Sequence, residues 1–368
     1  MHLRASVACS LVGLVAVLAL GGCRKKKEDR LATQLALGDA HSCATMKDLS
    51  IRCWGNARGA TAATVPTRVP GRWMFRQVVA GRSHSCGLVS DGTTPTRVVC
   101  WGGNAAGQCG DAPSKDDERE DILEVVDVVE LAAGGDTTCA RTKDGDVSCW
   151  GALAGTHVPT KVAAAHAEQI AVGGGHACVR VTGGSVLCWG DNAHGQLGTG
   201  TLAPSAIPVA VPGLANVARI ATGAAHTCAR VGDEKAMCWG KNDKGQLGDG
   251  TMIDRPSPVQ VGHITGAVQL SLGGDTSCAR MQDAAVMCWG DNGAHQLADS
   301  TTKNRAEAAL VFGVFDVVEA AVGAAHVCVR FKDARVRCWG GNAKGQVGDG
   351  STLEREVPVD VKFKDAVP

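Results

Sequence analysis

The chain has 368 residues, and its 37 Lys and Arg residues balance 37 Asp and Glu residues, so the formal net charge is zero. This balance argues against nucleic-acid binding, which needs a basic surface to displace phosphate counterions. Apolar residues make up 45% of the chain and charged residues 20%, so the chain can bury a core. The 17 cysteines indicate an oxidising compartment, and the 48 glycines disfavour long helices.

The first 23 residues, MHLRASVACSLVGLVAVLALGGC, are typical of a signal peptide, because one early arginine precedes an apolar stretch and small residues. The ending Leu20-Gly21-Gly22-Cys23 resembles the lipobox of bacterial lipoproteins, which implies acylation of Cys23. The absence of Asp after Cys23 favours the outer membrane under the sorting rule of those proteins. An uncleaved membrane anchor is the alternative, since residues 5–22 carry no charge. We predict a signal peptide at 1–22 and a lipid-attached basic linker at 23–31.

Seven copies of one unit follow. Fourteen cysteines form seven pairs, and Trp-Gly follows the second cysteine of each pair. Six pairs are ten residues apart and one is fourteen apart: Cys43 with Cys53, Cys86 with Cys100, Cys139 with Cys149, Cys178 with Cys188, Cys228 with Cys238, Cys278 with Cys288, and Cys328 with Cys338. First cysteines recur every 39 to 53 residues, a period typical of propeller blades.

The fifth repeat shows the unit most clearly. It predicts four short strands at 219–222, 226–231, 235–240 and 257–261, which we label A to D. Glycine-rich turns separate these strands. The B–C hairpin turns at Asp233, so Cys228 lies opposite Cys238. Opposed Cα atoms of an antiparallel pair are roughly 4.5–5.5 Å apart, within the range of a disulfide. We therefore predict seven intrablade disulfides, each stabilising the fold by roughly 3 kcal/mol.

A zinc site is the alternative use of these cysteines. Five repeats carry a histidine two residues before the first cysteine, and residues two apart share one strand face: His41, His84, His176, His226 and His326. Repeats three and six have Thr137 and Thr276 there and keep both cysteines. A disulfide survives that change and a three-ligand metal site does not, so we predict no metal. The histidines are instead expected to hydrogen-bond the backbone of the C–D loop.

The repeat phrase G-x-x-H-[ST]-C…C-W-G-x-N-x-x-G-Q-L-G-D-G resembles the regulator of chromosome condensation repeat over residues 32–362. Gly-Gln-Leu-Gly occurs at 195–198 and 245–248, in phase with Trp-Gly-x-Asn. The four-stranded repeat predicts, and the resemblance implies, an all-β fold: a seven-bladed β-propeller at 32–362 with a tail at 363–368. We expect the first strand (33–37) and the last (356–361) to pair and close the ring.

One repeat departs from the others at the D–A turn that leads into blade two. Residues there are large or charged where the fifth repeat has Leu, Ala, Asn, Val and Ala, and they form the candidate partner-binding patch: Arg72, Trp73, Met74, Phe75 and Arg76. Exposed Trp and Arg dominate the energetics of protein interfaces. The alternative is that Trp73 and Phe75 fill a gap beside the short first repeat. In the same repeat, Cys109 is predicted to be a buried free thiol, and the acidic segment 111–121 a solvated loop.

No common catalytic motif is present in the sequence. We predict a monomeric, cofactor-free lipoprotein of the bacterial cell envelope, held to the membrane by its lipid, whose propeller binds an unknown envelope or extracellular protein. Secreted bacterial proteins of the resembled family include β-lactamase inhibitors, so inhibition of an exported enzyme is one form of this function. Two alternatives stay open: guanine-nucleotide exchange on a small GTPase, implied by the nuclear member of the family, if the protein is intracellular, and an envelope hydrolase or lyase with a site at the propeller axis.

Overall fold

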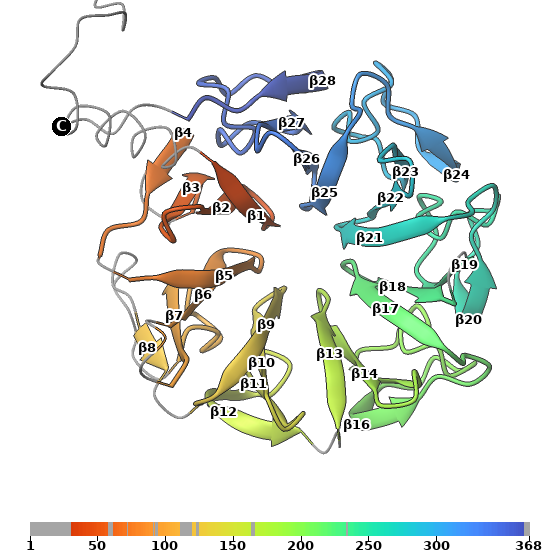
Figure 1. Ribbon diagram of the computed structural model, residues 1–368. Coiled ribbons are helices and arrows are strands. Elements are labelled where there is room, and N and C mark those ends of the chain that lie inside the picture. The colour runs from red at the N-terminus through yellow and green to blue at the C-terminus, as the bar shows by residue number, and fades with distance from the viewer. Residues whose placement is uncertain are drawn as a thin grey trace, which may run out of the picture.

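The computed structural model describes residues 31–57, 62–71, 73–90, 92, 95–110, 120–122, 125–162, 166–232 and 235–363. Its 28 strands form seven four-stranded antiparallel sheets, arranged as a ring around a central axis (Figure 1). Each sheet is made of four consecutive strands, with A nearest the axis and D at the outside. The described chain is therefore an all-β, seven-bladed propeller, as predicted. Among these residues, none forms a helix long and apolar enough to cross a membrane.

The strand bounds follow the repeats. Blades one and two consist of β1 (Ala32–Leu37), β2 (His41–Met46), β3 (Ile51–Gly55), β4 (Ala63–Arg68), β5 (Phe75–Ala80), β6 (His84–Val89), β7 (Arg97–Gly102) and β8 (Glu120–Ile122). Blades three and four consist of β9 (Val128–Gly134), β10 (Thr137–Thr142), β11 (Val147–Gly151), β12 (Thr156–Val162), β13 (Ala167–Val172), β14 (His176–Val181), β15 (Val186–Gly190) and β16 (Ser205–Ala210). Blades five to seven consist of β17 (Val217–Thr222), β18 (His226–Val231), β19 (Lys235–Gly240), β20 (Arg255–Gln260), β21 (Ala267–Gly273), β22 (Thr276–Met281), β23 (Val286–Gly290), β24 (Arg305–Leu310), β25 (Val317–Val322), β26 (His326–Phe331), β27 (Val336–Gly340) and β28 (Arg355–Asp360).

The register of strands B and C places the two cysteines of each blade directly opposite each other. In blade five, Cys228 of β18 pairs with Cys238 of β19, and their Cα atoms are 4.1 Å apart. The cysteine at position 109 is the buried free thiol that the sequence predicts. The opposed arrangement seen in blade five recurs in every blade and forms a disulfide there. This confirms all the predicted pairs: Cys43 with Cys53, Cys86 with Cys100, Cys139 with Cys149, Cys178 with Cys188, Cys228 with Cys238, Cys278 with Cys288, and Cys328 with Cys338.

The hydrophobic core lies between blades rather than within one central volume. Seven clusters of buried side chains occur, one at each junction of neighbouring blades. At the junction of blades four and five, Trp239 packs against Leu197, Val211 and Ile220. The tryptophan of each Cys-Trp-Gly therefore faces the preceding blade, where it meets the leucine of Gly-Gln-Leu-Gly if that blade has one. Each blade is stabilised through both of its faces.

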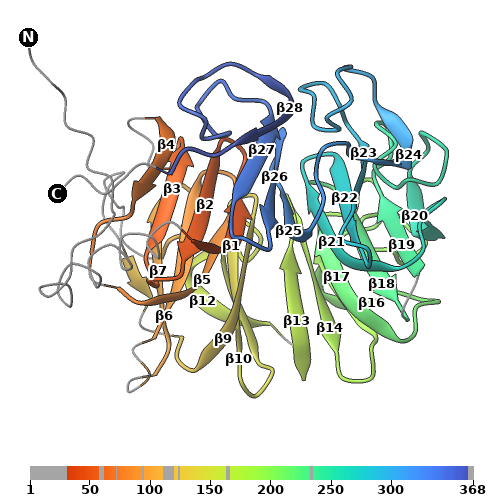
Figure 2. The same ribbon diagram turned by 45° about the horizontal axis from the view of Figure 1, so that its top comes forward.

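The ring does not close by pairing of the terminal strands, so that part of the sequence prediction is wrong. Strands β1 and β28 belong to different sheets, because each blade takes all four strands from one repeat. β1 is the innermost strand of its blade and β28 the outermost of its own, so they lie at different distances from the axis (Figure 2). Blades seven and one meet face to face instead: Leu35 N donates to Glu319 Oε1 at 3.0 Å, and Trp54 Nε1 donates to Gln346 O at 2.7 Å.

Candidate functional site

The five histidines lie in the junctions between blades and hold neighbouring blades together. His226 Nε2 of blade five lies 2.9 Å from Ser277 Oγ of blade six. Ser277 Oγ donates to the Gln246 carbonyl at 2.8 Å, and Trp289 Nε1 donates to the same oxygen at 2.9 Å. The predicted direct bond from histidine to loop backbone is therefore wrong in detail, because a hydroxyl of the next blade stands between them. The same contact recurs as His41–Ser85, His84–Thr138, His176–Thr227 and His326–Ser42.

This geometry fixes the tautomer of the four rings whose hydroxyl partner donates to a loop carbonyl, and these are His84, His176, His226 and His326. Because the Ser277 hydroxyl gives its proton to a carbonyl, His226 Nε2 must donate to the hydroxyl oxygen, which leaves Nδ1 without a proton. In the described part of the chain, Nδ1 of all five rings has no hydrogen-bond partner. Complete burial lowers the pKa of His41 to about 4 and that of the other four to about 3: His84, His176, His226 and His326. The rings are neutral structural groups and not acids or bases for catalysis near neutral pH.

Two junctions lack the histidine, and there the hydroxyl is missing too. In place of the histidine and the hydroxyl, blades three and four have Thr137 and Ala177, and blades six and seven have Thr276 and Val327. Ala177 and Val327 are fully buried. The histidine and the hydroxyl are thus exchanged together, which identifies the pair as a packing unit of the junction. The glycine three residues before the histidine leaves room for the ring, since a Cβ on Gly223 would lie 2.2 Å from His226 Cε1.

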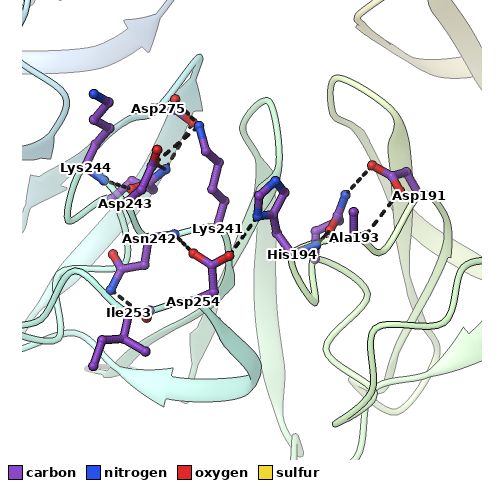
Figure 3. A network of polar contacts seen from close by, with 12 residues as sticks. Asp191, Ala193, His194, Lys241, Asn242, Asp243, Lys244, Ile253, Asp254 and Asp275 are labelled. Carbon is purple, nitrogen blue, oxygen red and sulfur yellow. Dashed lines mark hydrogen bonds and ion pairs between the residues drawn. The ribbon is translucent and has the colours of Figure 1, made fainter.

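The C–D loops of blades four and five form a polar surface, which we call the loop rim (residues 191–204 and 241–254). Figure 3 shows the contacts between the loops: His194 Nδ1 lies 2.7 Å from Asp254 Oδ2, and Asn242 N donates to the other oxygen of that carboxylate at 2.7 Å. Asn242 also donates from Nδ2 to Ile253 O at 3.0 Å, which fixes the loop backbone. The loop rim is therefore held in one conformation by hydrogen bonds across the two blades.

Charged side chains of the loop rim reach the junction with blade six. Lys241 Nζ is 2.8 Å from Asp275 Oδ2 and 3.3 Å from Asp243 Oδ1 (Figure 3). Burial alone would lower the pKa of Lys241, but the hydrogen bonds to both carboxylates outweigh it and raise that pKa. Large aliphatic side chains project from the same two loops: Leu202 is 57% exposed, Met252 47% and Ile253 62%. The loop rim combines ordered charges with exposed apolar side chains, as protein-binding surfaces do.

The propeller axis holds a cavity of about 180 Å³ that is lined mainly by glycine and alanine from all seven blades. Asp39 and Arg82 are its ionisable lining residues. Arg82 Nη1 lies 3.3 Å from Asp136 Oδ2, and Arg82 Nε lies 3.9 Å from Asp39 Oδ2, so one arginine joins blades one, two and three. Across the described residues, no group of His, Cys, Asp or Glu side chains is placed to hold a metal ion.

Comparisons with known proteins agree with this architecture. Two sequence profiles described as regulator of chromosome condensation (RCC1) repeat match more than half of the chain, one at residues 183–230 and 236–280, the other at 75–108, 128–152, 167–196, 217–246, 267–296 and 317–346. The chain belongs to this repeat family. A comparison with curated protein sequences finds no significant match.

Solved structures show the same fold as this RCC1-repeat chain. Prp20p from Saccharomyces cerevisiae is 21% identical, with 92% of this chain and 89% of Prp20p covered and a TM-score of 0.73. Yeast RCC1 (Prp20) bound to Kap60 is 20% identical, with 99% and 90% covered and a TM-score of 0.75. The ectodomain of the receptor kinase CR4 from Physcomitrella patens is 22% identical, with 84% and 73% covered and a TM-score of 0.56. At these identities the likeness concerns the fold.

The predicted patch at the turn into blade two is partly core. Phe75 is 2% exposed and packs edge-to-face on Trp101, with ring centroids 6.1 Å apart, so it is wrong as a surface residue. Trp73 is half-buried with the Arg97 guanidinium 5.2 Å above its ring, whereas Met74 and Arg76 are exposed. Arg72 and the lipidation candidate Cys23 lie outside the described residues, as does most of the acidic segment 111–121. The partner-binding role of this patch stays a prediction.

We expect Gly87→Ala to lower the free energy of unfolding by about 2 kcal/mol through overpacking. A Cβ on Gly87 would lie 2.5 Å from two ring atoms of Phe75. Four other blades have Ala at this position and Val or Ala at the position of Phe75, so the large ring and the glycine compensate each other. Urea denaturation of Gly87→Ala, Phe75→Val and the double variant would measure the coupling. If the two losses simply add in the double variant, the proposed compensation is wrong.

Sequence reasoning missed the most exposed aromatic side chains of the described chain. Phe312 is 72% exposed and Phe315 64% exposed, both at the D–A turn between blades six and seven. Phe315 occupies the position of Trp73. Phe315 lies two residues before Val317, which starts β25, and Trp73 lies two residues before Phe75, which starts β5. A comparison of all D–A turns, rather than of the most divergent one, would have found them.

Proposed function

We propose that this chain is a lipid-anchored protein of the bacterial cell envelope whose propeller binds another protein through the loop rim. The lipobox-like residues 20–23 and the seven buried disulfides support an exported, oxidised protein. The observation that carries the binding proposal is the exposure of Leu202 and Ile253 beside the fixed His194–Asp254 pair.

The alternative, regulation of a small GTPase, draws on Prp20p, whose structure is described together with its binding to Gsp1p and histones. Such an activity would require this chain to fold in a reducing compartment. The seven disulfides favour the envelope instead, and the CR4 ectodomain has the same fold outside the cell. An inhibitor of an exported enzyme is the form of protein binding that the loop rim would suit.

Binding is tested by affinity capture from envelope fractions with the purified, membrane-extracted protein. We expect Leu202→Asp together with Ile253→Asp to weaken capture of a stoichiometric partner at least about tenfold, because interface centres lose affinity when a charge replaces an apolar anchor. Ile207→Asp is the matched control, since Ile207 is 66% exposed on β16, outside the loop rim. Equal capture by both variants, with unchanged thermal stability, would remove the loop rim as the binding surface.

The envelope anchor is tested by the intact mass of the membrane-extracted protein with and without reduction. An acylated Cys23 at the N-terminus together with seven disulfides is the expected result. An uncleaved chain with free thiols would overturn the envelope proposal and favour the intracellular alternative.

A further inference from the structure

The two ends of the described chain meet on the face opposite the loop rim. This face carries the D–A and B–C turns, and we call it the turn face. Leu31 and Phe363 line one groove of about 550 Å³ there, together with Asp333 and Arg335 of the B–C turn of blade seven. Leu31 O accepts a hydrogen bond from Lys47 N at 2.8 Å, which fixes the start of the propeller on this face. Whatever precedes Leu31 therefore leaves from the turn face.

Large apolar side chains gather on the turn face around that point. Phe312 and Phe315 flank it at the turn into blade seven, and Met74, 39% exposed, and Val126, 52% exposed, lie at the turns into blades two and three. In the turns into blades five and six, the position of Phe315 is occupied by the smaller Ala215 and Thr265. The apolar side chains thus form an arc centred on blade one, where the chain enters the propeller.

Basic side chains fix and border the arc. The guanidinium carbons of Arg335 and Arg337 lie 5.4 and 5.7 Å from the centroid of the Phe331 ring. Arg337 Nη1 donates to the Gly313 carbonyl at 3.2 Å, which ties the turn that carries Phe312 and Phe315 to β27. Both guanidinium groups also pair with carboxylates, Arg335 with Asp333 at 2.6 Å and Arg337 with Asp360 at 2.8 Å. Exposed aromatics beside arginines are typical of protein surfaces that enter the headgroup region of a membrane.

We propose that the turn face docks on the lipid bilayer, with Phe312 and Phe315 in the headgroup region. This inference rests on the proposed membrane tether. Seven residues lie between Cys23 and Leu31, and the eight residue steps from one to the other reach at most roughly 28 Å, so the tether keeps the turn face close to the bilayer. An uncleaved anchor would tether the chain at the same end. Docking would orient the loop rim away from the membrane, toward soluble partners.

The chain contains its own probe for this contact. Seven of the eight tryptophans are at most 4% exposed, and Trp73 on the turn face is the half-buried exception. The purified full-length protein, reconstituted into vesicles of phosphatidylethanolamine and phosphatidylglycerol with brominated acyl chains, should show quenched tryptophan fluorescence. Trp73→Phe should abolish the quenching, and Phe312→Ala with Phe315→Ala should reduce it at least about twofold, because the apolar contact is lost. Leu202→Ala with Ile253→Ala, on the opposite face, should leave it unchanged.

Flotation of the same vesicles separates the two proposals. Protein that floats with the vesicles but shows no quenching overturns the docking and leaves the tether in place. Protein that stays at the bottom of the gradient overturns both. A third outcome combines two results: the protein floats without quenching, and the change of Phe312 and Phe315 abolishes capture of a partner. It would mean that a protein, and not the bilayer, covers the turn face.

Discussion

Lowering the pH from 7 to 5 is expected to reduce the free energy of unfolding by on the order of 10 kcal/mol, enough to unfold the propeller. The cause is the set of five buried histidines, whose pKa values lie at about 3 to 4 in the folded protein. In the unfolded chain a histidine takes up a proton near pH 6.5. Between these limits the unfolded state binds more protons, so stability is full above about pH 6.5 and falls as the pH drops. Each ring contributes about 2 kcal/mol over this interval.

The structure supplies a control for this acid sensitivity. The double variant His226→Thr, Ser277→Val reproduces the pair found at the junction of blades six and seven, Thr276 and Val327. It should remove about one fifth of the pH dependence, because it deletes one titrating ring of five. Urea denaturation at several pH values measures the slope for both proteins. An equal slope of the free energy of unfolding against pH in both proteins would contradict the assignment of the acid sensitivity to the buried histidines. A wild-type stability that is constant between pH 5 and 7 would contradict it too. Burial also raises the pKa of the carboxyl groups of Asp39, Glu130 and Glu319, but both proteins share these groups, so the difference between the two slopes reports the deleted ring.

The repeated part of the molecule could be predicted from the sequence because its causes are local. A cysteine ten residues from its partner, across a short hairpin, can meet it only in one register, and Trp-Gly marks the same strand in every blade. The closure of the ring could not be predicted in this way. It depends on which strand of a blade lies at the axis, and that is set by how blades pack on each other, as the Leu35–Glu319 contact shows.

The candidate site was harder to predict because exposure is a property of the packed ring. Phe75 is the first residue of its A strand and is 2% exposed, whereas Phe315 lies two residues before its A strand and is 64% exposed. The ring of Phe75 is buried because Gly87, which has no side chain, leaves space for it across the sheet. The histidine prediction failed for a related reason, since the hydroxyl that intervenes comes from the next blade, about 50 residues away.

Reduction of the disulfides is expected to prevent folding altogether. Each bridge closes a loop of about 11 to 15 residues and stabilises the native state by roughly 3 kcal/mol, so the loss of seven exceeds the 5–15 kcal/mol by which most domains are stable. All fourteen sulfurs belong to cysteines that are at most 4% exposed. Reductant should therefore leave the native protein intact and act quickly once denaturant exposes the bridges. Circular dichroism after removal of denaturant should show the native spectrum for the oxidised chain and the spectrum of an unfolded chain for the reduced chain.

The matched control is Cys228→Ala with Cys238→Ala, which removes one bridge from blade five and keeps the other six. It should still fold and lose about 3 kcal/mol, because the six remaining blades keep their own bridges and their packing. A reduced chain that regains cooperative unfolding would show that packing between blades suffices without disulfides. Since the core is divided among seven junctions, each with few aromatic side chains, we expect the opposite. A propeller built in this way can fold only where its cysteines become oxidised to disulfides, which is the physical link between its fold and the proposed place in the cell envelope.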